Sequence, residues 1–265
     1  ALAAPVIKAP AVPKIPQDNG IAFEDVSFTY AGSKEPALSH ISFTAKPGET
    51  IGIIGGTGCG KSTLVNLIPR FYDVTSGNVV IDGNNVKEYP FSQLRKKVGM
   101  VPQQAVLFKG TIRDNMKWGK EDASEEEIQR ALSIAQASGF VKSKPEGLNT
   151  MVSQGGANLS GGQRQRLTIA RALVGDPEIL IMDDSASALD FATDAALRHA
   201  IHEQTKGMTV FIVSQRATSI KQADKILVLD DGELAGVGTH KELMESCEVY
   251  REICLSQLSE QEVNR

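Results

Sequence analysis

Short apolar runs recur along the chain and are separated by polar stretches, which is the pattern of buried strands that alternate with helices. The helical spacing of apolar residues in the intervening stretches predicts helices over residues 62–68, 164–173 and 195–204, and an amphipathic helical tail from residue 241. Such alternation predicts an α/β fold with buried parallel strands. The strands are expected over residues 51–54, 98–101, 179–182, 210–213 and 226–229, the last being the final strand of the chain.

Two further strands with alternating apolar residues precede the first buried run. Residues 21–30 place Val26, Phe28 and Tyr30 on one face, and residues 41–45 alternate in the same way. Two antiparallel strands that lead into a buried parallel strand predict a β layer added to the α/β core.

Residues 111–149 show no strand pattern. Within them, Ser124 and Glu127 have the spacing of a capping box that opens a helix. The apolar face of that helix is expected to comprise Ile128, Ala131, Leu132 and Ala135. We therefore predict a helical subdomain, over about residues 104–168, inserted in the α/β core.

The ends and the composition limit the function classes. Residues 1–19 hold four prolines among small residues, which predicts an extended linker ahead of a domain over residues 20–265. Because the chain starts with Ala1, we expect it to be cut from a longer protein. The net charge of −4 gives no reason to expect nucleic-acid binding, and no apolar run reaches the length of a membrane span. Three cysteines form no disulfide framework, which suits a reducing compartment.

Residues 55–62 lie between a predicted strand and a predicted helix and fit the phosphate-binding pattern G-x-x-x-x-G-K-[ST]. The glycines let successive backbone N–H groups turn toward phosphate oxygens, Lys61 can neutralise the β- and γ-phosphates, and the Ser62 hydroxyl can ligate Mg²⁺. The alternative is a glycine-rich turn with a chance lysine, which is disfavoured because every position and both flanks fit. The expected nucleotide-binding residues are Gly55, Gly56, Thr57, Gly58, Cys59, Gly60, Lys61, Ser62 and Thr63.

Three further polar side chains stand at or near the ends of predicted strands. Asp183 follows residues 179–182 and is placed to hold Mg²⁺, because open α/β sheets bind ligands at the carboxyl ends of their strands. Gln103 follows residues 98–101. Its side chain can reach Mg²⁺ or a water molecule at the site, and the alternative is that it is a solvated amide in a loop. Tyr30 either stacks on an adenine ring or packs on the rim of its sheet.

A second candidate anion site precedes the predicted helix over residues 164–173. Ser160 is followed there by Gly161, Gly162 and Gln163, whose amides lie at the start of the helix. Either these N–H groups bind an anion, or Ser160 is an ordinary N-cap followed by a flexible turn. Physical reasoning alone leaves both alternatives open.

The phosphate loop, the sequence Leu-Ser-Gly-Gly-Gln at residues 159–163 and the strand ending at Asp183 occur together in this order. The combination resembles the nucleotide-binding domain of ATP-binding cassette (ABC) transporters, over roughly residues 20–258. The resemblance implies a P-loop NTPase (RecA-like) α/β core with an antiparallel β subdomain and an inserted α-helical subdomain. It implies binding of ATP with Mg²⁺, with Ser62, Gln103 and Asp183 at the metal, Tyr30 on the adenine, and residues 187–190 as the D-loop. Ser160, Gly161, Gly162 and Gln163 are then the family's signature.

Three positions depart from the family pattern. The first is Gln154, which stands where the family commonly has a glutamate just before the signature, and the other two concern the catalytic step. Asp184 stands where the family has a catalytic glutamate, and Gln215 stands where it has a switch histidine. Asp184 is one methylene short, and a base must come within about 2.6–3.2 Å of the proton it takes. Gln215 can donate a hydrogen bond to a γ-phosphate but cannot carry an imidazolium charge. With Gln103, these are the residues expected at the catalytic step, and we predict retained binding with turnover reduced by about 10²–10⁴-fold.

This pattern resembles the degenerate half of a heterodimeric, multidrug-type ABC exporter. The resemblance implies a partner nucleotide-binding domain whose competent site is completed by residues 160–163 of this chain. It also implies fused or associated transmembrane domains and a place at the cytoplasmic face of the cell membrane. Two alternatives stay open: a homodimeric, fully active exporter ATPase, and a non-transport ABC ATPase that acts as a nucleotide-controlled clamp.

Overall fold

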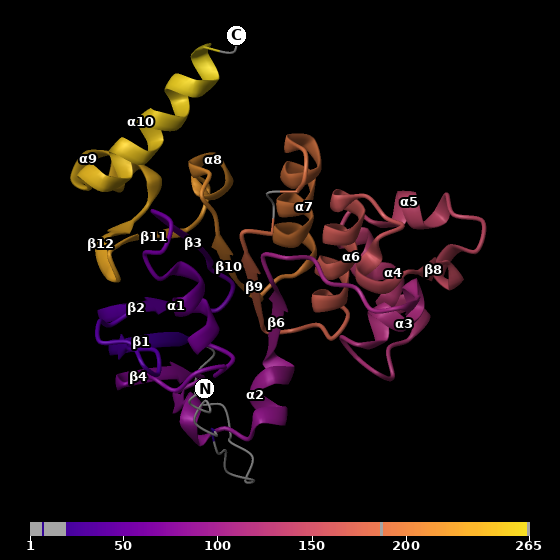
Figure 1. The fold of residues 1–265 in the computed structure, drawn as a ribbon, viewed down its shortest axis with the longest axis horizontal. Coiled ribbons are helices and arrows are strands. Elements are labelled where there is room, and N and C mark those ends of the chain that lie inside the picture. The colour runs from indigo at the N-terminus through magenta and orange to yellow at the C-terminus, as the bar shows by residue number, and fades with distance from the viewer. Residues whose placement is uncertain (1–6, 8–19, 186–187, 264–265) are drawn as a thin grey trace. The chain divides into compact units, whose positions relative to one another are not determined.

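The computed structural model describes residues 7, 20–185 and 188–263 (Figure 1). The chain forms two compact units: unit 1 comprises residues 1–98 and 209–265, and unit 2 comprises residues 99–208. The predicted linker, apart from Ile7, lies outside the described residues, as does Ser187 of the predicted D-loop.

Unit 1 contains an antiparallel sheet in the strand order β2-β1-β4-β5, where the strands are β1 (Ile21–Phe28), β2 (Leu38–Ala45), β4 (Ser76–Ile81) and β5 (Asn84–Asn85). A bulge interrupts β1, since its register shifts between Phe23 and Val26 and Asp25 has φ 49°. A Cβ on Gly77 of β4 would lie 2.3 Å from the Asp25 carbonyl oxygen, so only glycine fits beside the bulge. The predicted antiparallel pair is confirmed, with the bulge resetting its alternation.

The strand β3 (Thr50–Gly55) is the buried strand that leads to the phosphate loop. It pairs in parallel with β10 (Thr209–Val213) and with β11 (Lys225–Asp230), and Ile51, Ile53 and Ile54 are completely buried. A strand in this position is covered on both faces, which explains its unbroken apolar run. The helices of unit 1 are α1 (Lys61–Leu67), η1 (Val86–Glu88), α2 (Phe91–Lys97), α8 (Ala217–Ile220), α9 (His240–Ser246) and α10 (Glu248–Val263).

The C-terminal part of unit 1 differs from the prediction in two ways. Residues 226–229 are not in the last strand, because β12 (Glu233–Gly238) follows and pairs antiparallel with β11. Glycines weaken the strand pattern of β12. A Cβ on Gly236 would lie 2.9 Å from Leu243 Cδ2, so glycine at this position allows α9 to pack closely on the strand. The predicted tail is two helices, divided at Cys247, where φ −116° and ψ 108° are extended.

Unit 2 contains the strand β9 (Ile179–Asp183), which is buried along its length and lies next to β6 (Val98–Val101). A short antiparallel pair, β7 (Gly110–Thr111) and β8 (Met151–Val152), accompanies the helical segment. The capping box at Ser124 is confirmed. The helices are α3 (Ile112–Lys117), α4 (Glu125–Ile134), α5 (Ser138–Lys142), η2 (Gly147–Asn149), η3 (Gln154–Gly156), α6 (Gly161–Leu173) and α7 (Phe191–Gln204).

The elements of the two units together confirm the predicted fold class, an α/β P-loop core with an antiparallel β sheet and a helical segment. The boundaries of the helical subdomain, about residues 104–168, remain a prediction. Unit 2 is wider than that range, since it also contains β9 and α7.

Tyr250 anchors α10 to unit 1. Its side chain is completely buried and its hydroxyl lies 2.8 Å from His240 Nδ1. We expect Tyr250→Ala to lower the free energy of unfolding by about 3–5 kcal/mol, because it empties a large buried volume. Tyr250→Phe keeps the ring and removes the hydroxyl with its hydrogen bond to His240, so a smaller loss of about 0.5–1.5 kcal/mol is expected. Urea unfolding of both variants measures the difference, and equal losses would contradict this account of the anchor.

Candidate functional site

Close backbone contacts require glycine at both ends of the phosphate loop. Gly55 has φ 156°, and a Cβ there would lie 2.1 Å from the Leu229 carbonyl oxygen of β11. Gly60 has φ 99°, and its Cβ would lie 2.7 Å from a backbone carbonyl oxygen of the residue before β2. In contrast, nothing lies within 4 Å of a Cβ built on Gly56 or Gly58. The ends of the loop are therefore fixed by neighbouring strands, while its middle is open to a ligand.

Lys61 is held over the loop by the loop's own backbone. Its Nζ donates to the carbonyl oxygens of Gly55 at 2.9 Å and of Gly56 at 2.6 Å, and it lies 3.7 Å from Cys59 Sγ. The helix α1 begins at Lys61 and is anchored by buried residues. An ammonium group so placed is ready to contact an anion in the loop.

Tyr30 connects the antiparallel sheet to α1. Its hydroxyl lies 2.8 Å from Thr63 Oγ1, and its ring packs edge-on against Phe28 and Tyr72, with centroids 4.7 Å and 5.3 Å away. The ring thus packs at the rim of the sheet, as one of the two alternatives predicts, yet the residue stays 37% exposed. Stacking on an adenine remains a prediction.

In unit 2, the structure brings Gln103 and Asp184 together. Asp183 ends β9 and is buried, whereas Asp184 is partly exposed and turns the chain with φ 43°. Aspartate is among the residues that tolerate this left-handed conformation. Gln103 Nε2 donates to Asp184 Oδ2 at 3.4 Å. A sequence pattern predicts each residue at a strand end, but only the fold shows that the amide contacts this carboxylate.

Ser160 is the N-cap of α6, and the helix begins directly at Gly161 and not at residue 164, so no flexible turn follows the cap. Its hydroxyl accepts from the Gln163 amide at 3.2 Å, and Gln163 Oε1 accepts from the Ser160 amide at 3.1 Å. The amides of Gly161 and Gly162 lie outside this capping box. An anion at this end of α6 remains a prediction, which the helix dipole favours.

The backbone on either side of Gln215 is held by other elements of unit 1. The Ser214 amide donates to the Ile53 carbonyl of β3 at 3.0 Å. Beyond it, Gln257 of α10 donates from Nε2 to the Gln215 carbonyl at 2.6 Å and accepts from the Ala217 amide at 2.8 Å. The Gln215 side chain is exposed. Sequence reasoning missed Gln257, because a lone glutamine on an amphipathic tail carries no pattern.

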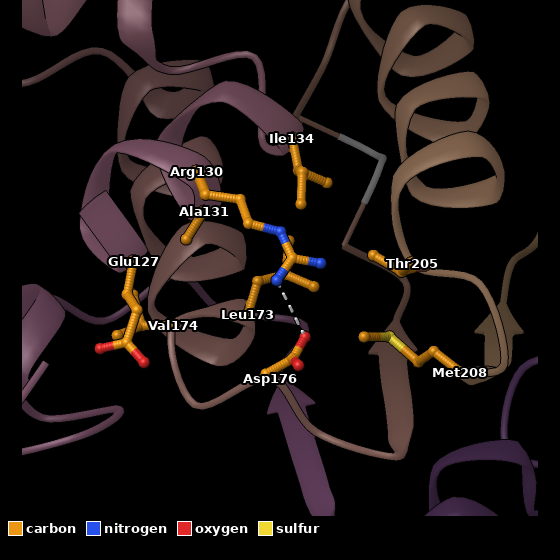
Figure 2. Close-up of a pocket in the computed structure, with 9 residues that line it drawn as sticks. All are labelled: Glu127, Arg130, Ala131, Ile134, Leu173, Val174, Asp176, Thr205 and Met208. Carbon is orange, nitrogen blue, oxygen red and sulfur yellow. Dashed lines mark ion pairs between the residues drawn. The ribbon is translucent and has the colours of Figure 1, made fainter. Parts of the chain in front are cut away.

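A small cavity in unit 2 has no part in the predicted site (Figure 2). Its volume is about 70 Å³, whereas pockets that bind small molecules measure roughly 300–1,000 Å³. At its edge, Arg130 forms an ion pair with Asp176 at 3.4 Å. It is too small for a nucleotide. Its lining residues are Glu127, Arg130, Ala131, Ile134, Leu173, Val174, Asp176, Thr205 and Met208.

A glycine-bounded loop with its lysine after a buried strand, and a buried aspartate at the end of another, define a P-loop NTPase domain. The family model for the ABC transporter matches residues 38–187. The chain therefore belongs to the ABC transporter family and is an ABC ATPase domain, so the resemblance seen in the sequence is confirmed at this level.

Several characterised and uncharacterised proteins are similar to the chain. An uncharacterized ABC transporter ATP-binding protein, YfiB of Bacillus subtilis (strain 168), is 48% identical over 237 residues, 89% of this chain and 41% of that protein. The putative multidrug export ATP-binding/permease protein YgaD of the same strain is 45% identical, over 88% of this chain and 40% of that protein. An ATP-dependent lipid A-core flippase of Vibrio vulnificus (strain CMCP6) is 44% identical, over 89% of this chain and 41% of that protein.

A solved structure is also similar. The structure of a bacterial Atm1-family ABC exporter with ATP bound matches 95% of this chain and 45% of that chain, with a TM-score of 0.90 and 35% identity. The chain thus spans about two fifths of the length of the curated relatives named here. In the part of the chain that the structure describes, no helix combines the length and the apolar character needed to cross a membrane.

Gly55 and Gly56 offer a matched test of the loop conformation. We expect Gly55→Ala to lower the free energy of unfolding by about 2–4 kcal/mol, because its Cβ would overlap the Leu229 carbonyl at a φ suited to glycine. Gly56→Ala enters open space, so a change below about 0.5 kcal/mol is expected. Urea unfolding without nucleotide measures both. A larger loss for Gly56→Ala would show that the loop is folded differently.

Proposed function

We propose that the chain is the ATP-binding domain of one half of a heterodimeric ABC exporter. Its own site binds ATP with Mg²⁺ and hydrolyses it slowly, and its signature segment completes the site of a partner domain. One observation carries the proposal: an intact phosphate loop is combined with Asp184 and Gln215 where the family has a glutamate and a histidine.

The residues of unit 1 suit the binding of a triphosphate. The middle of the loop is open at Gly56 and Gly58, and Lys61 Nζ is already directed at the loop. Exchange of its two carbonyl partners for β- and γ-phosphate oxygens replaces neutral acceptors with charged ones, which makes stronger hydrogen bonds. Tyr30, partly exposed next to Thr63, would take the adenine ring.

The proposed metal ligands fit Mg²⁺ by their chemistry. Ser62, Gln103 and Asp183 offer a hydroxyl, an amide and a carboxylate, and Mg²⁺ prefers hard oxygen donors. When bound, the ion neutralises charge on the phosphates. Asp183 is buried at the end of β9, the end of a strand at which open α/β sheets bind their ligands.

Hydrolysis is the step that the substitutions weaken. The Asp184 carboxylate is one methylene shorter than that of glutamate, and the Gln103 amide contacts it at 3.4 Å. A general base contributes about 10²–10⁴-fold to a rate and must contact the proton that it removes. Gln215 can donate a hydrogen bond to the γ-phosphate, but it stays neutral. Neither residue belongs to the loop that would hold the phosphates, so binding would be retained.

The signature segment would serve the partner. Its helix, α6, extends over 13 residues from the capping box, and the amides of Gly161 and Gly162 lie at its positive end. Donors that are preorganised in this way stabilise the charge that develops on a transferred phosphoryl group. A chain that is a weak hydrolase at its own site can therefore still be needed for hydrolysis at its partner's site.

The proposed transporter places the domain at the cytoplasmic face of the cell membrane, with fused or associated transmembrane domains. The support comes from the relatives, one described as a putative multidrug export ATP-binding/permease protein and another as an ATP-dependent lipid A-core flippase. These descriptions favour export of drug-like or lipid-like compounds, and the exporter with ATP bound favours ATP as the nucleotide.

Restoring the family residues tests the proposal. We expect Asp184→Glu combined with Gln215→His to raise the steady-state ATPase rate of the chain by about 10- to 1,000-fold, with an unchanged ATP affinity, because a base of full length and a chargeable imidazole return to the γ-phosphate. Phosphate release gives the rate, and calorimetric titration with Mg²⁺ and ATP gives the affinity.

Asp176→Glu is the matched control for Asp184→Glu, because it also places a longer side chain on a residue with a left-handed backbone conformation. Asp176 shares the left-handed conformation, with φ 49°, and is exposed, so this variant should leave hydrolysis unchanged. Brisk hydrolysis by the wild-type chain that the double substitution does not raise would contradict the proposal and favour a homodimeric, fully active exporter ATPase. Nucleotide-dependent closure on a partner without membrane domains would instead favour a non-transport clamp.

A further inference from the structure

The C-terminal helix contacts the backbone at the switch position through one side chain. Gln257 of α10 donates from Nε2 to the Gln215 carbonyl at 2.6 Å and accepts at Oε1 from the Ala217 amide at 2.8 Å. Both polar ends of one amide group are thus bonded to a single short segment. Loss of this side chain would release the segment on both sides of Arg216 at once.

The segment needs a partner of this kind. Ala217 opens α8, and the N-cap residue Arg216 offers no side-chain hydrogen bond to the first turn. The first amides of a helix lack partners within the helix, so they require other acceptors. Gln257 supplies one across 40 residues of sequence, and Ser214 Oγ accepts from the Arg216 amide at 3.0 Å. The backbone is therefore held while the Gln215 side chain is exposed.

The position of Gln257 is itself restrained by the packing of α10. It follows Tyr250 and Cys254 at helical spacing, and both of these are buried, with exposed fractions of 0% and 5%. Positions spaced in this way share one face of a helix. The buried face of α10 therefore places Gln257 against residues 215–217. The burial of this face limits how far the side-chain amide of Gln257 can move.

We propose that Gln257 is a positioning residue: it fixes the backbone at Gln215 so that the Gln215 amide reaches the γ-phosphate of bound ATP. The inference rests on the proposed function, which places Gln215 at that phosphate. Gln257 does not contact the nucleotide. Its effect is confined to ligands that carry a γ-phosphate, because only these contact the side chain that it positions.

The test compares the affinities of the 265-residue chain for ATP and for ADP, each with Mg²⁺, by calorimetric titration. Gln257→Met keeps the length of the side chain and removes both hydrogen bonds. We expect it to weaken ATP binding by about three- to tenfold, the range for one poorly placed hydrogen bond, and to leave ADP binding within about twofold. Gln257→Glu keeps the acceptor for the Ala217 amide and loses the donor, so it should weaken ATP binding as well.

Two further variants separate positioning from general stability. Ser256→Ala changes the adjacent residue, whose hydroxyl donates within α10 to the Ile253 carbonyl at 2.9 Å, and should leave both affinities unchanged. In a Gln215→Ala chain, Gln257→Met should cause no additional loss of ATP affinity, because the side chain that it positions is already gone. Faster hydrogen exchange of the Ala217 amide in Gln257→Met would report the released backbone directly.

The outcomes are distinct. If Gln215→Ala weakens ATP binding but Gln257→Met does not, the positioning role is wrong while the proposed function stands. If the losses from the two substitutions add, or ADP binding falls equally, Gln257 is only structural and the inference is overturned. If Gln215→Ala leaves the preference for ATP over ADP unchanged, then Gln215 is not at the γ-phosphate, and the inference fails together with that part of the proposed function.

Discussion

The close approach between Gly55 and the Leu229 carbonyl of β11 is the constraint on which the nucleotide-binding half of the structure depends. A Cβ at position 55 would lie 2.1 Å from that oxygen, so the residue at which the chain leaves β3 must be glycine. The backbone direction at Gly55 determines the path of the phosphate loop, and the loop leads directly into α1, which begins at Lys61. The lysine ammonium then lies over the first two loop carbonyls. A steric condition on one backbone atom thus determines where the Lys61 ammonium group lies.

Much of this half could be predicted from the sequence, because its signals are local. The buried run over residues 51–54, the glycine spacing and the lysine identify strand, loop and helix without reference to the rest of the chain. The capping box at Ser124 of unit 2 was predictable in the same way, since N-cap and N3 residues are three apart in sequence. The same holds for Asp183, which directly follows an unbroken apolar run.

Other features could not be predicted, because tertiary packing overrides the local pattern. The strand β12 contains two glycines and no apolar alternation, yet Gly236 allows Leu243 of α9 to approach the strand closely. The bulge at Asp25 depends on Gly77 in a different strand. The contact of Gln257 with Gln215 joins residues 42 positions apart, and that of Gln103 with Asp184 joins residues 81 apart. Glutamine side chains are common on surfaces, so only the fold distinguishes these two.

In the function that we propose, binding and cleavage of the nucleotide are separable, since the loop that would hold the phosphates is intact while Asp184 and Gln215 lie outside it. Single-turnover hydrolysis with the chain in excess over radiolabelled ATP tests this separation most directly. The account predicts that bound ATP is cleaved slowly, at a rate that Asp184→Asn lowers by less than about threefold, because little base catalysis remains to be lost. Rapid cleavage by the wild-type chain, abolished by Asp184→Asn, would contradict it.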